Sequence, residues 1–355
     1  MRQMTLTEIN RAQPSRTAYF DHLRVFASFL IMLLHIAALC WYDADVNSSS
    51  WFILNAFKSA TDHAVLLFVM ISGSLFLGRD IPIKKLYSKY ILRIAVAFVA
   101  WSFIYALVSN FRWGILSVLQ VTLASHYHLW FLPLIAGLYI CIPIFRLIVK
   151  NDRNIRYFLI LAFIFAFLIP QCLTLAADFG GTTISQYAGF IQERLDEMNV
   201  HLVCGYAFFF VAGYYINKTD IPKKLRLLSY ILAAVGFFIT LFMTTFQARH
   251  TGTPLDNYHE NFNIGVLLTL LGTFIFFKYN VNRESRLIVR LSKYSFGAYL
   301  VHALIIEQLA SRLGLTAVSF NPVLATLAIG IIVFIVSFAI SALLNLIPGI
   351  RRYIV

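Results

Sequence analysis

The sequence has few charged residues: Asp, Glu, Lys and Arg make up 13% of its 355 residues, against 60% hydrophobic residues. Soluble domains are typically about a quarter charged, so this composition excludes an ordinary soluble protein. The mean hydropathy of +0.76 points the same way. No polar stretch is long enough to fold separately, so we predict one integral membrane domain.

Cysteine is scarce and carries no motif. The four cysteines lie in or beside apolar runs: Cys40, Cys141, Cys172 and Cys204. None forms a CxxC pair or stands at zinc-finger spacing from histidine, so we interpret them as apolar helix residues. His126-x-His128, and His250 with His259 and Glu260, are spaced too loosely to suggest a metal site. We therefore expect no metal cofactor.

A secretory signal peptide is also not evident. The first eighteen residues are polar, and no small-residue cleavage site follows the long apolar run after them. We expect three regions: a cytoplasmic N-terminal tail at 1–18, a membrane domain at 19–350, and a cytoplasmic C-terminal tail at 351–355.

Long apolar runs occupy most of the chain. A membrane-spanning helix needs about 20 apolar residues, and backbone groups in lipid must be paired within a helix. We predict an all-α, polytopic membrane helical bundle of about ten transmembrane helices. The predicted spans are 22–41, 56–77, 90–109, 128–148, 157–175, 200–216, 227–246, 262–278, 294–311 and 323–347.

Basic residues are distributed unevenly over the two sides of this topology. Of the 29 Lys and Arg residues, 24 fall on the side of the termini. Five fall on the other side: Lys58, Arg112, Arg194, Arg249 and Arg312. This asymmetry predicts that both termini are cytoplasmic. The topology and anionic lipid account for the net charge of +13, so no nucleic-acid partner is expected.

The first apolar run holds two ionisable residues eleven positions apart, Arg24 and His35. In an α-helix this spacing is three turns plus about 20°, with a rise of ~16 Å, so both residues lie on one face. Asp21 falls on nearly the same face. Arg24 also suits an interfacial anchor, and His35 also suits a polar contact between helices. An ionisable residue inside the membrane is nevertheless a candidate functional site, and histidine exchanges protons near neutral pH.

A second basic group lies at the predicted cytoplasmic start of the third span. Lys85, Lys89 and Arg93 are spaced four residues apart, which predicts a basic stripe along a helix. Arginine binds phosphate through paired hydrogen bonds and lysine binds it as a point charge. A phosphate-bearing molecule held there would reach ~15–20 Å inward, about the rise to His35. A solvated loop explains Lys85 equally well, but it explains Arg93 less well.

Several segments resemble one known family. Arg24, ten residues, then His35 is similar to the signature of the integral-membrane acyltransferase family 3. The segment FVMISGSLF at 68–76 resembles the second-helix motif of that family, which ends in Ser-Gly. Three more segments are similar to its other landmarks: KYILRI at 89–94, HLWFLPLIAGLYICIPIF at 128–145 and YSFGAYLVHALII at 294–306. Together these segments cover most of the chain in the expected order.

This resemblance implies a chemistry and a set of roles. The family transfers an acetyl group from acetyl-CoA on the cytoplasmic side to a hydroxyl, usually of a sugar. Arg24, Lys89 and Arg93 would hold the phosphates of CoA while the pantetheine arm carries the thioester inward. His35 would act as a general base on the acceptor hydroxyl or as a transient acyl carrier, and both roles stay open.

Two short stretches supply candidates near the second span. Ser72 and Gly73 are candidates for close approach to the oxyanion of the tetrahedral intermediate, although Gly73 also suits a small-residue helix contact. Asp62 and His63 enter the same span from the outer side. They would either orient His35 or lie at the interface.

Three later residues are weaker candidates. His302 suits a structural polar contact or a catalytic role beside Tyr299. His128 and Trp130 begin the fourth span at the outer interface. The aromatic belt of membrane proteins explains Trp130, although aromatic faces also bind sugars.

We therefore expect an O-acetyltransferase of the cell inner membrane. It would move an acetyl group from cytosolic acetyl-CoA to a hydroxyl of a cell-surface polysaccharide or its lipid-linked precursor. The alternative is a transporter of a glycan or acylated glycan that performs no acyl transfer. The expected partners are acetyl-CoA, the acceptor and membrane lipid.

Overall fold

The computed structural model describes residues 17–110, 114–198 and 200–355, and every regular element within these ranges is a helix. The predicted all-α class is therefore confirmed. Six helical stretches of the described chain are long and apolar enough to cross a membrane. A bent pair, Ile115–Ala124 with Tyr127–Ile140, makes a seventh if it counts as one span. The predicted N-terminal tail lies almost wholly outside the described residues.

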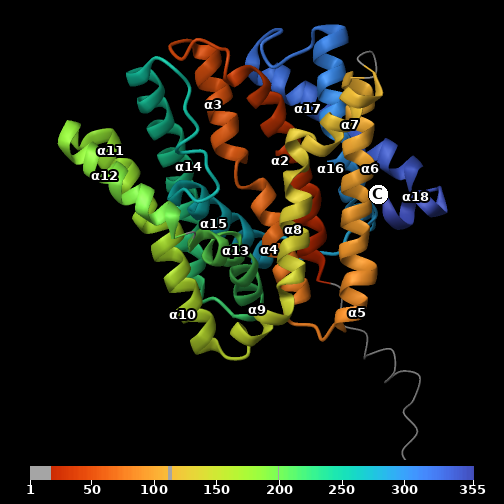
Figure 1. Ribbon diagram of the computed structural model, residues 1–355, viewed down its shortest axis with the longest axis horizontal. Helices are drawn as coiled ribbons and strands as arrows, with labels where there is room; N and C mark the ends of the chain where they lie inside the picture. Colours follow the sequence, from red (N-terminus) through yellow and green to blue (C-terminus); the bar gives the residue numbers. More distant parts are fainter. Residues whose placement is uncertain (1–16, 111–113, 199) are drawn as a thin grey trace, which may run out of the picture.

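The helices follow one another with short connections (Figure 1). The first half contains α2 (Ala18–Trp41), α3 (Ser49–Thr61), α4 (Ala64–Phe76), α5 (Ile83–Lys85), the π-helix η1 (Leu86–Ile91), α6 (Leu92–Asn110), α7 (Ile115–Ala124), the 3₁₀-helix η3 (Tyr127–Trp130), α8 (Phe131–Ile140), α9 (Ile142–Ile148) and α10 (Asp152–Phe163). The second half contains the π-helix η4 (Ile164–Leu168), α11 (Ile169–Phe179), α12 (Gly181–Glu197), α13 (Val200–Lys218), α14 (Lys223–Thr251), α15 (Ile264–Asn280), α16 (Arg286–Leu313), α17 (Pro322–Leu344) and α18 (Pro348–Tyr353).

Each of the ten predicted spans falls largely on helical residues, but several are broken. The span predicted at 56–77 is two helices, α3 and α4, which meet at Asp62 and His63. The span predicted at 128–148 is divided among η3, α8 and α9. The number of ten spans and the cytoplasmic side of the termini stay predictions, because length and hydropathy mark six or seven of these stretches.

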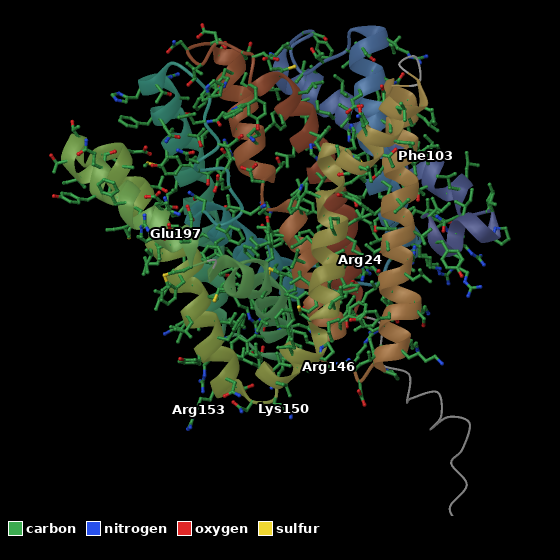
Figure 2. The ribbon with its side chains drawn as sticks, viewed as in Figure 1. Arg24, Phe103, Arg146, Lys150, Arg153 and Glu197 are labelled. Atoms are coloured by element: carbon green, nitrogen blue, oxygen red, sulfur yellow. The ribbon has the colours of Figure 1, made fainter. Side chains whose placement is uncertain are left out.

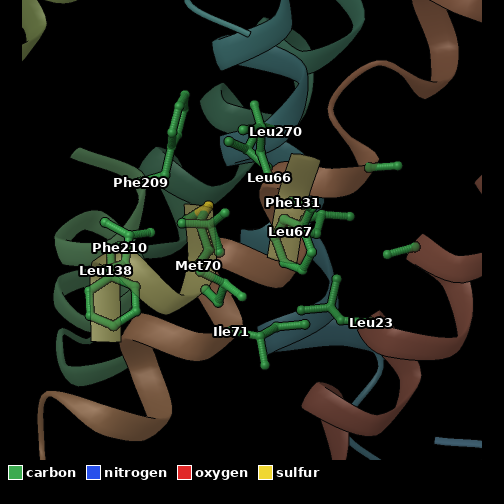
Figure 3. Packing of buried hydrophobic residues seen from close by; sticks show 14 of the residues in the cluster. Leu23, Leu66, Leu67, Met70, Ile71, Phe131, Leu138, Phe209, Phe210 and Leu270 are labelled. Atoms are coloured by element: carbon green, nitrogen blue, oxygen red, sulfur yellow. The ribbon is translucent and has the colours of Figure 1, made fainter. Parts of the chain in front are cut away.

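The core is built around α4. Its residues Leu66 and Met70 are fully buried, and they lie among Phe209 and Phe210 of α13 and Leu270 of α15 (Figure 3). Such a helix, apolar on all sides, is typical of the centre of a bundle. Helix α4 therefore fixes the positions of the helices around it.

Glycine allows α4 and α13 to approach closely. A Cβ atom on Gly73 would lie 1.8 Å from the carbonyl oxygen of Phe210, and one on Gly213 would lie 2.2 Å from that of Met70. Neither position has room for a side chain. Gly73 thus makes the small-residue helix contact that was one of its two interpretations from the sequence.

One end of the bundle carries basic residues, and two helices stand apart at one side. Arg146, Lys150 and Arg153 lie together at one end (bottom of Figure 2), where α9 meets α10. Helices α11 and α12 stand off to one side (left in Figure 1), and Ala188 is the buried residue of α12.

Candidate active site

A cavity of about 770 Å³ opens among α2, α3, η3, α16 and the connection between α14 and α15. We call it the histidine cavity, because His35 and His128 line it. Its other polar and aromatic lining residues include Tyr42, Lys58, Asp62, Tyr127, Trp130, Tyr206, Asp256, His259 and Glu307. Pockets of this size, with an apolar wall and a few polar groups, are typical of ligand sites.

Three imidazoles meet beside this cavity. The ring centroid of His302 lies 5.2 Å from that of His35 and 5.2 Å from that of His128. The ring of Tyr127 meets His35 edge-on at 5.3 Å. Among the described residues, Nε2 of His128 and Nε2 of His302 have no hydrogen-bond partner. The fold therefore brings together three histidines that the sequence singled out, and two of their ring nitrogens stay without a hydrogen-bond partner in the described chain.

A second cavity, of about 290 Å³, is lined by basic and by mostly apolar side chains. We call it the arginine cavity, because Arg24 and Arg93 line it together with Lys293. The remaining walls come mainly from aromatic and aliphatic side chains: Phe68, Tyr90, Ile94, Phe131, Ile135, Tyr139 and Phe296. It therefore suits a small ligand, or part of one, that carries both negative charge and apolar surface.

Two neighbours hold Arg24 in place. Its Nη1 lies 3.3 Å from Oδ1 of Asp21, and the hydroxyl of Ser292 donates to the same Oδ1 at 2.6 Å. Asp21 is 2% exposed, so this carboxylate is a buried anchor. Asp21 thus supports Arg24 and lines neither of the two cavities described here.

The predicted basic stripe forms only in part. Arg93 lines the arginine cavity, and its Nη2 donates to the carbonyl oxygen of Val355 at 2.6 Å. Lys89 is exposed, with its ammonium 5.6 Å from the centre of the ring of Tyr90. The stretch Leu86–Ile91 is a π-helix, so the α-helical spacing assumed for Lys85, Lys89 and Arg93 does not apply there.

The two cavities share a wall. Val65 and Tyr299 line both of them, so the partition is one layer of side chains at this place. Helix α2 runs past both cavities, with Arg24 in one and His35 in the other. A ligand bound by its charged end at Arg24 would reach towards His35. Two adjacent cavities of this kind would suit group transfer between two separately bound substrates.

The model of the family described as an acyltransferase domain, acyltransferase family 3, matches residues 17–342. The chain belongs to this family. No curated protein and no solved structure matches it significantly. All residues of the two cavities lie within the matched range, so the family's chemistry, acyl transfer in the membrane, is to be sought there.

In this acyltransferase, Asp62 and His63 have different surroundings. Asp62 lines the histidine cavity, but its Oδ2 pairs with Nδ1 of His259 at 2.5 Å. Nε2 of His259 lies 2.8 Å from Oδ1 of Asn55. His63 is buried outside both cavities. Asp62 therefore orients His259. In the described structure, neither Asp62 nor His63 makes a hydrogen bond with His35.

An ion pair ties the same connection to α3. Nζ of Lys58 lies 3.0 Å from Oδ1 of Asp256, and the hydroxyl of Tyr42 donates to Oδ2 at 2.5 Å. Burial alone would raise the pKa of Asp256, but the Lys58 ammonium and the Tyr42 hydroxyl outweigh it and hold this pKa below its ordinary value. Burial and the charge of Asp256 raise the pKa of Glu260. Charged side chains of the acyltransferase therefore line this part of the histidine cavity.

Of the remaining candidates from the sequence, one lines each cavity and one lines neither. Ser72 lines the arginine cavity and accepts a hydrogen bond from the hydroxyl of Tyr139 at 3.4 Å. Trp130 lines the histidine cavity, with its ring 5.8 Å from that of Tyr206. Gly73 packs against α13 and lies outside both. Within the described residues, no group of three His, Cys, Asp or Glu side chains is arranged to hold a metal ion.

Some site residues could not be identified from the sequence. Lys293 belongs to one of several basic connections, and nothing in its spacing separates it from its neighbours. In the sequence Tyr299 stands out only as a neighbour of His302, and its place in the partition depends on how α16 packs. Lys58 does carry a signal, since it is one of few basic residues on the predicted outer side.

Proposed function

We propose that this acyltransferase is an inner-membrane O-acetyltransferase that moves an acetyl group from cytosolic acetyl-CoA to a hydroxyl of a glycan. The observation that carries the proposal is the shared wall, with Arg24 and His35 on one helix but in adjacent cavities. One cavity suits the charged donor and the other suits a polar acceptor. Both termini are then cytoplasmic, on the side of the arginine cavity.

The donor site is the arginine cavity. At about 290 Å³ it is near the lower limit for ligand pockets, so we assign it to the pantetheine arm and its thioester. Arg24, Arg93 and Lys293 supply positive charge for the phosphates, as charge-assisted hydrogen bonds require. The nucleotide then lies at the mouth, where Lys89 is exposed beside Tyr90.

The acceptor site is the histidine cavity. The rings of Tyr127, Trp130 and Tyr206 offer flat apolar faces, and the surrounding carboxylates accept hydrogen bonds from hydroxyls. This combination suits a saccharide. Within the family, MISG at 70–73, HLWF at 128–131 and HALII at 302–306 most resemble the O-acetyltransferase of enterobacterial common antigen. We therefore take a cell-surface polysaccharide, or its lipid-linked precursor, as the acceptor.

His35 performs the central proton transfer. Its imidazole takes the proton of the acceptor hydroxyl while the hydroxyl oxygen attacks the thioester carbonyl carbon. The carbon–sulfur bond then breaks, the acetyl ester remains on the glycan, and the CoA thiolate takes up a proton. A general base of this kind contributes about 10²- to 10⁴-fold to the rate.

Transfer of label in membranes tests this function. Everted membrane vesicles from cells that express the protein receive acetyl-CoA labelled in the acetyl group, and incorporation into the glycan fraction is measured. We expect incorporation with the wild type and a loss of about 10²-fold or more with His35→Ala. His250→Ala is the matched control, because His250 is exposed at the end of α14 and should leave incorporation unchanged.

The same vesicles separate an enzyme from a transporter. A transporter would move glycan across the membrane without acetyl-CoA and would give no incorporation of label. Mass spectrometry of His35 in the working enzyme completes the test. If an acetyl-imidazole were found at His35, the role of His35 would be that of a transient acyl carrier and not that of a general base.

A further inference from the structure

Glu307 and His126 form a hydrogen-bonded pair beside the site that the steps above do not use. Nε2 of His126 lies 2.9 Å from Oε1 of Glu307, and Nδ1 of His126 lies 2.7 Å from Nδ1 of His128. The ring of Tyr105 stacks on His126 at 4.1 Å and fixes its plane. Glu307, His126 and His128 are therefore joined by consecutive hydrogen bonds.

The direction of these hydrogen bonds follows from their chemistry. An ionised carboxylate only accepts, so His126 carries its hydrogen on Nε2. The other nitrogen of neutral His126 is then bare and accepts from Nδ1–H of His128. It follows that Nε2 of His128 carries a free lone pair. This atom is buried and makes no hydrogen bond in the described chain, in a residue that lines the histidine cavity and whose ring also lies within hydrogen-bonding reach of the Leu300 backbone.

His302 lies next to this lone pair but differs in one respect. Its Nδ1 donates to the carbonyl oxygen of Tyr299 at 2.5 Å, so its Nε2 is also bare. A peptide carbonyl cannot take over a proton from Nδ1 at neutral pH. His302 can therefore hold a proton at Nε2 but cannot pass it on through its other nitrogen, whereas His128 can.

We propose that His128, His126 and Glu307 form a proton-transfer chain, which takes up a proton at Nε2 of His128 and stores it on Glu307. The hydrogen-bond pattern of the chain does not depend on what the protein acetylates. Its use in acyl transfer rests on the function proposed above, in which His35 removes a proton from the acceptor.

The transfer balances without any further reactant. A proton binds Nε2 of His128, the Nδ1–H bond of His128 breaks, and that hydrogen binds Nδ1 of His126. The Nε2–H bond of His126 then breaks and its hydrogen binds Oε1 of Glu307. Both imidazoles end neutral in their other tautomers, and the carboxylate has become a carboxylic acid. The reverse sequence returns the proton, and the CoA thiolate needs one when it leaves.

The far end of the chain reaches water. The side chain of Glu307 is 31% exposed, whereas His128 is 1% exposed. Glu307 lines the histidine cavity and also a neighbouring cavity of about 840 Å³ beside Leu39 and Asp43. A proton stored on Glu307 is therefore close to solvent, while the entry at His128 stays enclosed.

Nitrogen NMR on the full-length protein in lipid bilayers, labelled with ¹⁵N-histidine, tests the chain directly. Coupling across the hydrogen bond between the two Nδ1 atoms identifies His126 and His128 without any substitution. At neutral pH we expect hydrogen on Nε2 of His126 and on Nδ1 of His128. Hydrogen on Nε2 of His128 in this state would overturn the proposal, because the entry would be closed.

Lowering the pH should add a proton to the proton-transfer chain. In the wild type we expect both tautomers to exchange while both rings stay neutral. In Glu307→Gln, which has no carboxylate to store the proton, one ring should become an imidazolium instead. Glu193→Gln, an exposed carboxylate on α12, is the matched control and should behave as wild type. An imidazolium in the wild type, or tautomer exchange in Glu307→Gln, would contradict the storage role.

Acetyl transfer gives a second and separate readout. We expect Glu307→Gln to lower kcat by on the order of tenfold or more and to change its pH profile, with partial recovery in Glu307→Asp. The other titratable groups facing the chain stay in place in these variants: His35 of α2, Tyr105 of α6, Tyr127, and Tyr299 and His302 of α16. An unchanged kcat and pH profile would remove the chain from the reaction. Absence of any acetyl transfer in the wild type would reject the proposed function but leave the NMR result decisive for the chain.

Discussion

The hydroxyl of Tyr299 donates a hydrogen bond to the carbonyl oxygen of His128, and Tyr299 is also part of the wall between the two cavities. This contact fixes a side chain that, on the proposed function, a thioester would pass on its way from Arg24 to His35. Tyr299 is 6% exposed, so little else can take its place in the wall. On the proposed function, this wall would keep the donor and the acceptor apart until the thioester arrives.

Removing this side chain should uncouple the reaction. In Tyr299→Ala the wall loses its ring, so we expect water from the histidine cavity to reach the thioester. CoA release should then exceed acetylation of the acceptor, as measured with a thiol reagent and with labelled acetyl groups. Tyr299→Phe keeps the ring and should stay coupled. Equal coupling in Tyr299→Ala would mean that Tyr299 does not separate the cavities.

Arg24 should govern the affinity for the donor. Loss of a hydrogen bond to a charged group costs about 1.5–3 kcal/mol, so we expect Arg24→Ala to raise the KM for acetyl-CoA by about ten- to a hundredfold. Arg24→Lys retains the charge and should recover part of this loss. Arg153→Ala is the control, since Arg153 is exposed at the bottom of the bundle in Figure 2, away from Arg24. A KM unchanged in Arg24→Ala would place the CoA phosphates elsewhere.

The crossing of α4 and α13 should tolerate no side chain at Gly73. A Cβ there would meet the carbonyl oxygen of Phe210 at 1.8 Å, so Gly73→Ala must push the helices apart. Overpacking of this kind typically costs about 1–3 kcal/mol. We expect a lower melting temperature in detergent. Gly137→Ala on α8 meets no atom within 4 Å and should melt like the wild type. Equal melting of both variants would show that the helices do not cross this closely.

The tie between Lys58 and Asp256 should depend on pH. Because the pKa of Asp256 is held below its ordinary value, its stabilising effect is present above the ordinary aspartate pKa of about 3.9 and is lost as the pH falls through the lower folded value. We expect Asp256→Asn to melt earlier than the wild type at neutral pH, with the difference shrinking at strongly acidic pH. A constant difference across this range would mean that the carboxylate charge is not the cause.

The parts of the site that lie on one helix could be predicted from the sequence. Arg24 and His35 share α2, so helical geometry alone relates them, and the structure places them in adjacent cavities. Lys89 shows where this reasoning stops. The π-helical stretch at Leu86–Ile91 changes the angular spacing of the side chains along the helix. No residue pattern in the sequence predicts this stretch.

Contacts between distant segments could not be predicted. Asp62 pairs with His259, which is 197 residues further along the chain. His126 and Glu307 meet because η3 packs against α16, and spacing along the sequence carries no information about such a pairing. The residue types that can take part in the chemistry are thus evident from the sequence, but their contact partners are determined by the three-dimensional packing.

The sidedness of acetyl-CoA tests the central claim most directly. Sealed membrane vesicles of either orientation receive labelled acetyl-CoA, which does not cross the bilayer, on the outside only. We predict that everted vesicles, which expose the end with Arg24, incorporate label into glycan and that right-side-out vesicles do not. Incorporation in right-side-out vesicles alone would contradict the passage of the acetyl group from the arginine cavity to His35.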